Sequence, residues 1–269
     1  MRPLLGSLLL LCLAAPVTEG AIRRRRVPLH QGSSGASLRK RIHINSLITQ
    51  EGTVEVETGG NASLTGDVAG AFALPTVIKF TPKSTQTEYN VSFDGLAREV
   101  SGSGSATHFS DRVTAGVTHE FSGWRGISLA AGPQVSIFTR GSTGVRWGGV
   151  GLARVNLWRR WDGGITAAYS QATHSSDINP LRLLDLGGGF GRKLSPRVTA
   201  HANYLYEKAT GYSPQHSLYE GIEFQFTPRL ALDVSVQQIG VGGSVVDHQL
   251  VAGLTMNFGR PGSWLRPRR

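Results

Sequence analysis

The sequence predicts an all-β protein, a transmembrane antiparallel up-and-down β-barrel of about twelve strands. Short segments of alternating apolar and polar residues follow one another from about Thr53 onward, and the chain holds 35 glycines without a convincing helical period. Short turns alternate with longer loops, and aromatic residues gather beside the turns. After the first 20 residues no segment offers the ~18 consecutive apolar residues of a membrane helix.

The first residues predict a cleavable export signal. Arg2 precedes an apolar run from Leu4 to Ala15, and small and polar residues lead to Gly20, after which we expect cleavage. A membrane anchor is the alternative, but the apolar run is too short to cross a bilayer core of ~30 Å as a helix. Cys12 is the only cysteine and lies in this segment. The mature chain is therefore expected to have no disulfide.

Charge is concentrated at the two ends of the chain. The formal net charge is +10, but basic and acidic residues nearly balance between positions 42 and 259. Residues 21–50, which include Arg23 to Arg26, lack periodicity and predict a flexible basic N-terminal arm. Residues 51–259 are the expected barrel, and residues 260–269 a basic tail. Basic ends of this kind are typical of contacts with anionic lipid or of inert tethers, so we expect no nucleic-acid partner.

The clearest alternation lies near the C-terminus, where Leu250, Leu254 and Phe258 alternate with Gln249 and Thr255. Successive side chains of a strand point to opposite faces, so each such segment has one apolar and one hydrophilic wall. A soluble sandwich would bury its apolar face, whereas a membrane barrel turns that face toward lipid. We expect strands at roughly 53–59, 74–81, 87–94, 111–121, 126–138, 144–156, 164–172, 182–190, 197–207, 217–226, 230–238 and 248–258.

The connections separate these two architectures. Turns such as Thr81 to Ser84 and Thr227 to Arg229 are short, while Gly95 to Ser110 and Ile239 to Asp247 are longer. Outer-membrane barrels show this asymmetry, with the short turns facing the periplasm. Aromatic residues predict a belt at the short-turn rim: Phe80, Phe121, Trp124, Trp158, Trp161, Phe190, Phe226 and Phe258. Candidates for a second belt are Phe138, Trp147, Tyr169, Tyr206 and Tyr219.

Short motifs over about residues 126 to 259 resemble a known family. They include Gly191-Arg192-Lys193-Leu194-Ser195-Pro196-Arg197, Phe226-Thr227-Pro228-Arg229 and Gly253-Leu254-Thr255-Met256-Asn257-Phe258-Gly259. With these motifs the chain resembles outer-membrane β-barrels assigned as transporters, including those of the phenol meta-pathway type. The resemblance implies a passive pore or transporter for small or hydrophobic molecules. The chain departs from the usual pattern because Phe258 is not terminal but is followed by Gly259 to Arg269.

The hydrophilic phase predicts the pore-lining residues and the partners. We expect outer-membrane lipid, the barrel-assembly machinery and possible small-molecule cargo as partners. A lumen of mixed charge can be an open, cation-favouring pore or a closed core of ion pairs. A structural or adhesive barrel without transport is therefore the alternative function. The expected pore-lining residues are Glu55, Glu57, Lys79, Glu88, Asp94, Glu120, Arg146, Arg154, Asp185, His201, Glu207, Glu223 and Asp233.

Catalysis and cofactor binding find little support in the sequence. His108 and Ser110 loosely resemble the spacing in outer-membrane lipid-A deacylases, but Asp111 stands where that resemblance prefers Asn. A nucleophile also needs its base within ~3 Å and a third group that orients the base. The histidines are scattered, and Gly187 to Gly189 lie in a strand-like stretch rather than a phosphate-binding loop. We therefore expect no catalytic residue, no metal and no cofactor, with a lipid-modifying enzyme as the weakest alternative.

Overall fold

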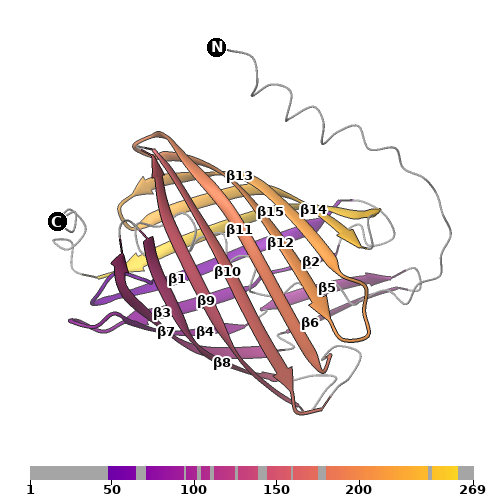
Figure 1. Cartoon of the computed structure of the whole chain (residues 1–269). Coiled ribbons are helices and arrows are strands. Elements are labelled where there is room, and N and C mark those ends of the chain that lie inside the picture. The colour runs from indigo at the N-terminus through magenta and orange to yellow at the C-terminus, as the bar shows by residue number, and fades with distance from the viewer. Residues whose placement is uncertain are drawn as a thin grey trace.

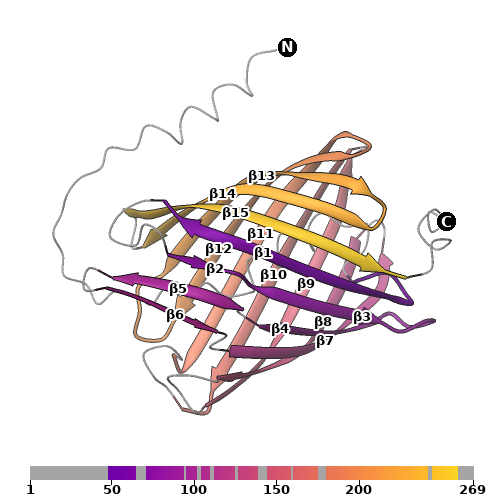
Figure 2. The same cartoon turned by 180° about the vertical axis from the view of Figure 1, so that it is seen from behind.

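The computed structural model describes residues 48–259 except 65–70, 94, 102–103, 110–111, 125–126, 139–143, 159, 175–179 and 242–243. The described chain forms one 15-stranded antiparallel sheet, and twelve of its strands close into a barrel (Figure 1). The barrel closes where β1 (Thr53–Ser63) pairs with β15 (Ser244–Phe258), and Figure 2 shows these two strands side by side. In the described part of the chain no helix is long and apolar enough to cross a membrane.

Each remaining strand of the barrel pairs with its neighbour along the chain, and the expected number and order of strands are confirmed. Most of the strands have 11 to 15 residues, enough for a tilted strand to cross a bilayer. Between β1 and β15 the order is β3 (Thr76–Thr81), β4 (Thr87–Phe93), β7 (Arg112–Trp124), β8 (Ile127–Phe138), β9 (Val145–Trp158), β10 (Trp161–Ala172), β11 (Arg182–Ser195), β12 (Val198–Ala209), β13 (Gln215–Thr227) and β14 (Leu230–Val241).

Three short strands lie outside the closed ring. They are β2 (Phe72–Ala73), β5 (Leu96–Ser101) and β6 (Gly104–Phe109), which extend the sheet from the far end of β1. The expected longer connection from Gly95 to Ser110 thus contains a hairpin of two of these strands, β5 and β6. β5 and β6 pair with each other from Leu96 opposite Phe109 to Ser101 opposite Gly104, and β5 also pairs with Phe72 and Ala73 of β2. Gly95 joins β4 to β5 with a φ of +64°, and a Cβ at this position would lie 1.9 Å from the carbonyl oxygen of Leu74.

The two rims differ as expected, with one exception. The connections at the rim where β1 begins and β15 ends are short: β11 and β12 are separated by two residues, and so are β13 and β14. The exception is the predicted long loop from Ile239 to Asp247, because the strand pairing continues to Val241 opposite Ser244. A register shift between Ile239 and Gly240 accommodates the extra residues. This glycine-rich stretch is thus a bulged continuation of the hairpin rather than a loop.

The two faces of the barrel wall are inverted relative to a soluble protein. Leu250 is 46% exposed, whereas Gln249 beside it is 0% exposed. We call the face with exposed apolar residues the outer wall and the opposite face the inner wall. A soluble sandwich would bury the apolar face instead, so the distribution supports a barrel that turns this face toward lipid. Exposed aromatics near the short-turn rim include Phe80, Phe121, Phe190, Phe226 and Phe258.

The second aromatic belt is only partly as predicted. Trp147 and Tyr169 are exposed on the outer wall, but Phe138 and Tyr219 are buried. Phe138 shares its strand phase with the buried Ser136, and Tyr219 shares its phase with Ser217. These two aromatics therefore belong to the inner wall and cannot sit in a lipid-facing belt.

Candidate functional site: the inner wall of the barrel

The structure places the described members of the predicted pore-lining set on the inner wall. Asp185, Glu207, Glu223 and Asp233 are half-buried there, and Asp94 lies outside the described residues. The other members are buried: Glu55, Glu57, Lys79, Glu88, Glu120, Arg146, Arg154 and His201. Their strands alternate between these polar positions and exposed apolar positions. Whether they line an open pore stays a prediction.

Lys79 holds two carboxylates on the neighbouring strand. Glu55 lies opposite Lys79 in the register of β1 and β3. The Lys79 Nζ is 3.2 Å from Glu55 Oε1 and also donates to Glu57 Oε1. Only 1% of Lys79 is exposed. Charges removed from water this completely need partners at hydrogen-bond distance, and each member of the cluster therefore depends on the others.

A polar network joins the first and last strands from inside. Gln249 Nε2 donates to Asp247 Oδ2 at 2.9 Å and to Ser63 Oγ at 3.3 Å. Ser63 Oγ donates to the same Asp247 oxygen at 2.8 Å, and Asn61 Nδ2 donates to Gln249 Oε1 at 3.0 Å. The network supplements the backbone pairing of β1 with β15 and satisfies polar groups that are fully buried.

His201 reaches Asp233 although β13 lies between their strands. Gly221 of β13 stands opposite His201 on one side and opposite Ser235 on the other. A Cβ on Gly221 would lie 2.9 Å from His201 Cε1. The missing side chain therefore leaves room for the imidazole to cross, and its Nε2 lies 2.5 Å from Asp233 Oδ2. Ser235 Oγ donates to the other carboxylate oxygen at 3.2 Å.

A second group of charges lies toward the longer-loop rim. Arg146 donates from Nη1 to Ser170 Oγ at 3.1 Å and from Nη2 to the carbonyl oxygen of Pro180. Asp185 and Glu207 stand opposite each other in the register of β11 and β12. Two adjacent carboxylates are tolerable here because Arg112 and Arg146 are close enough to interact electrostatically with both.

Pairing between the two charge types continues nearer the short turns. Arg154 Nη2 is 2.9 Å from Asp162 Oδ2. The sequence analysis missed Asp162, Arg112 and Asp247 as inner-wall residues. Asp162 and Asp247 fall just before the expected strands, and extending the alternation by two residues would have found them. Arg112 shares the phase of Thr118 and Glu120 and was visible within its expected strand.

The chain immediately before β1 also contacts the inner wall. Thr49 donates from its backbone N and from Oγ1 to Glu88 Oε2, each at 2.7 Å. Ile48 and Thr49 are both buried. Nothing in the sequence distinguishes these residues from the expected flexible arm, because a two-residue contact carries no periodicity.

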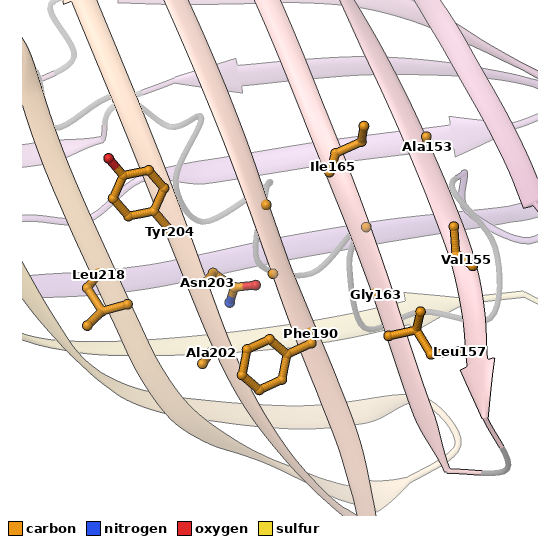
Figure 3. A pocket seen from close by; sticks show the side chains of 13 residues that line it. Ala153, Val155, Leu157, Gly163, Ile165, Phe190, Ala202, Asn203, Tyr204 and Leu218 are labelled. Atoms are coloured by element: carbon orange, nitrogen blue, oxygen red, sulfur yellow. The ribbon is translucent and has the colours of Figure 1, made fainter. Parts of the chain in front are cut away.

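The outer wall has a hollow of about 450 Å³ over β9 to β13. Gly163, Gly188 and Ala202 leave space there, and Figure 3 shows Ile165, Phe190 and Tyr204 around it. Glu220, which is exposed, stands opposite Ala202 in the register of β12 and β13. The full lining is Ala153, Val155, Leu157, Gly163, Gly164, Ile165, Gly188, Gly189, Phe190, Ala202, Asn203, Tyr204 and Leu218. These apolar walls suit hydrocarbon, such as lipid chains, rather than a polar solute.

Gly189 of β11 has a packing role. A Cβ on Gly189 would lie 2.0 Å from Asn203 Oδ1 and 2.7 Å from the carbonyl oxygen of Ala202. Close approach of β12 thus requires glycine at position 189. No group of three or more His, Cys, Asp or Glu residues that could hold a metal is found in the described part of the chain. Ser110 and Asp111, considered with His108 for catalysis, lie outside the described residues.

Comparison with known proteins identifies the fold. No family model and no curated protein matches the chain. An outer membrane channel from Pseudomonas putida F1 matches with a TM-score of 0.59 at 10% identity, covering 78% of this chain and 97% of that chain. The KdgM porin matches with a TM-score of 0.56 at 9% identity, covering 76% and 99%. The NanC porin has a TM-score of 0.55 at 8% identity, covering 75% and 98%.

The similarity to these structures and the exposed apolar outer wall define the structural class of the protein. The chain has the fold of transmembrane β-barrels of the outer-membrane type. At this level of identity the similarity extends to the fold and no further.

Proposed function

We propose that this protein is an outer-membrane channel that passes small or hydrophobic molecules down their gradient. The observation that carries the proposal is the closed ring of twelve strands with an apolar outer wall and a charged inner wall. A polar inner wall stabilises water in the lumen, and water provides the path for a solute. The names of the similar structures, two porins and an outer membrane channel, support the same function.

The inner wall has the charges that would set selectivity. Acidic positions outnumber basic ones on it, which favours cations. Glu223 and Asp233 stand opposite each other on β13 and β14, and both are half-buried rather than buried. We propose that Glu223 contributes to the electrostatic field of the pore. Asp233 contributes less, because its carboxylate is bonded to His201.

A closed structural barrel is the second candidate, and the inner wall also gives a specific reason for it. Lys79, Arg154 and Gln249 are buried and bonded to other inner-wall side chains rather than left facing solvent. In a barrel without a pore, the polar and charged groups of the interior are satisfied by pairing with one another in this way.

Conductance distinguishes the two candidates. The purified mature protein would be reconstituted into a planar lipid bilayer, and current would be recorded in a gradient of potassium chloride. A channel gives discrete steps with a cation-selective reversal potential, and Glu223→Gln should reduce that selectivity. Glu220→Gln is the matched control, because it removes the same charge from the outer wall of the same strand. A barrel that folds and gives no current in any of these forms would contradict the channel.

We further propose that the chain is exported with cleavage after Gly20 and is inserted by the barrel-assembly machinery among outer-membrane lipids. The apolar outer wall supports the lipid environment. Intact-mass measurement tests the cleavage after Gly20, and fractionation of the cells tests the outer-membrane location. An uncleaved N-terminus or a cytoplasmic pool would contradict this route.

A further inference from the structure

The hollow in the outer wall lies at the end of the strands that is nearer to the short turns. Phe190 and Leu157 line it on this side (Figure 3), and Gly188 stands at its far edge on β11. From Arg192, which follows Phe190 on the same face of β11, back to Gly188, the strand advances ~13 Å. The hydrocarbon core of a bilayer is ~30 Å thick. The hollow therefore lies within a single leaflet, with its near end at the short-turn rim.

An arginine lies just beyond this near end of the hollow. Arg192 is exposed, shares the outer phase of Phe190 and stands opposite Trp161 in the register of β10 and β11. Its guanidinium carbon is 5.3 Å from the centre of the Trp161 ring, and the ring centres of Trp161 and Phe190 are 5.8 Å apart. Tryptophan prefers the level at which hydrocarbon meets head groups. The three side chains thus lead from the hollow to a cation at head-group level.

The charges around the hollow are complementary to a phosphate at the Arg192 end. Arg160, in the turn between β9 and β10, and Arg197, in the turn between β11 and β12, are both exposed. Within the described part of the chain, the Arg192 side chain makes no ion pair or hydrogen bond, so its planar fork can donate two parallel bonds to a phosphate. Glu220 is exposed on the β13 side of the hollow and repels an anion placed there. The anionic group is therefore favoured at the short-turn rim.

We propose that the hollow is a binding site for one membrane phospholipid, with the phosphate on Arg192 and one acyl chain in the hollow. Gly163, Gly188 and Ala202 provide the space for that chain. The volume of about 450 Å³ falls within the ~300–1,000 Å³ of typical ligand sites. This lipid is held more tightly than the lipid around the rest of the barrel, because the hollow and the cation act on the same molecule. The site requires a lipid-facing outer wall but not a conducting lumen.

Native mass spectrometry tests recognition of the phosphate. The purified protein in detergent would be titrated with phosphatidylglycerol, and the fraction that retains one lipid would be measured. Arg192→Gln should weaken the affinity about tenfold, because charge-assisted hydrogen bonds to the phosphate are lost. Lys83→Gln removes a positive charge from the same rim, at the turn between β3 and β4, and is the matched control. Diacylglycerol, which lacks the phosphate, should bind to the parent as weakly as phosphatidylglycerol binds to Arg192→Gln. Equal retention of phosphatidylglycerol by the parent and Arg192→Gln would overturn the proposal.

Filling the hollow tests the position of the acyl chain. Ala202→Leu adds apolar atoms in the outer phase of β12, where they occupy the space of the chain, and should reduce the affinity at least about tenfold. Ala252→Leu makes the same change on the outer wall of β15, away from the hollow, and should bind lipid like the parent. Both variants keep the outer wall apolar, and gel mobility verifies that they fold. Unchanged affinity in Ala202→Leu would overturn the proposal. If Ala202→Leu instead abolishes a species of twice the protein mass, the hollow binds a second copy of the chain and the phospholipid site is rejected.

Discussion

His201 and Asp233 are joined across an intervening strand, with Nε2 and Oδ2 2.5 Å apart. The imidazole passes over Gly221 of β13, which stands opposite His201 of β12 and opposite Ser235 of β14. Asn203 Nδ2 lies 3.2 Å from His201 Nδ1, so both ring nitrogens have a partner. The contact depends on the absence of a side chain at one position of the strand between.

Gly221→Ala should therefore destabilise the barrel and break this contact. The new Cβ would lie 2.4 Å from Ser235 Cβ and 2.6 Å from the carbonyl oxygen of Val234, a degree of overpacking that costs about 1–3 kcal/mol. Urea unfolding in detergent or vesicles measures the change. Gly253→Ala is the control, because its nearest neighbour would be Asp233 Cβ at 3.9 Å. Equal stability of the two variants would refute the packing argument.

Lys79→Met should destabilise the barrel by about 3–5 kcal/mol, because it leaves two buried carboxylates without their cation. The triple variant with Glu55→Gln and Glu57→Gln should recover much of that loss. The comparison uses the free energy of unfolding of the parent, the single and the triple variant. A triple variant no more stable than Lys79→Met would show that the cluster acts through shape rather than charge.

Val234→Arg should cost ~2–4 kcal/mol, because Val234 belongs to the lipid-facing phase. It is 37% exposed on the outer wall. Glu223→Arg is the inner-wall control, because Glu223 is half-buried on the opposite face of the same hairpin. Folding into lipid vesicles, followed by gel mobility, compares the two variants. If both fold equally well, the outer wall does not face lipid.

Gly95→Ala should cost more than Gly211→Ala. Both glycines have positive φ, +64° and +84°, so alanine is strained at either position by about 1–2 kcal/mol. Only Gly95 is crowded, with the carbonyl oxygen of Leu74 1.9 Å from a new Cβ, while nothing lies within 4 Å at Gly211. The difference in unfolding free energy between the two variants measures the cost of crowding between residue 95 and the carbonyl group of Leu74. Similar losses would mean that the hairpin moves aside without cost.

The strands were predictable because lipid imposes a strict alternation. Leu232, Val234, Leu250 and Leu254 could be assigned to the outer phase because polar residues are costly at those positions. The same rule does not restrict the inner wall, where Phe138 and Tyr219 pack as well as serine does. Their assignment to a lipid-facing belt therefore failed.

The contacts within the inner wall were not predictable for a different reason. His201 meets Asp233 only because the register of one strand pair places His201 opposite Gly221, and the register of the next places Gly221 opposite Ser235, two residues from Asp233. A shift of one pair by two residues would preserve every apolar and polar phase and destroy this contact. The pairing of β5 with β2 likewise depends on a neighbour that is distant along the chain.

The pairing of β1 with β15 determines how the molecule must assemble. The other strands of the ring join neighbours along the chain and can form as hairpins, but Val54 must find Phe258. Until it does, the intermediate is an open sheet with two unsatisfied edges, which are prone to pair with other chains. Joining these edges closes a loop that contains nearly the whole sheet. The conformational entropy of that loop is lost before the hydrogen bonds between β1 and β15 form. The slow step of folding is thus expected at this seam. In a hydrogen-exchange pulse, the amides that pair β13 with β14 should become protected before the amides that pair β1 with β15.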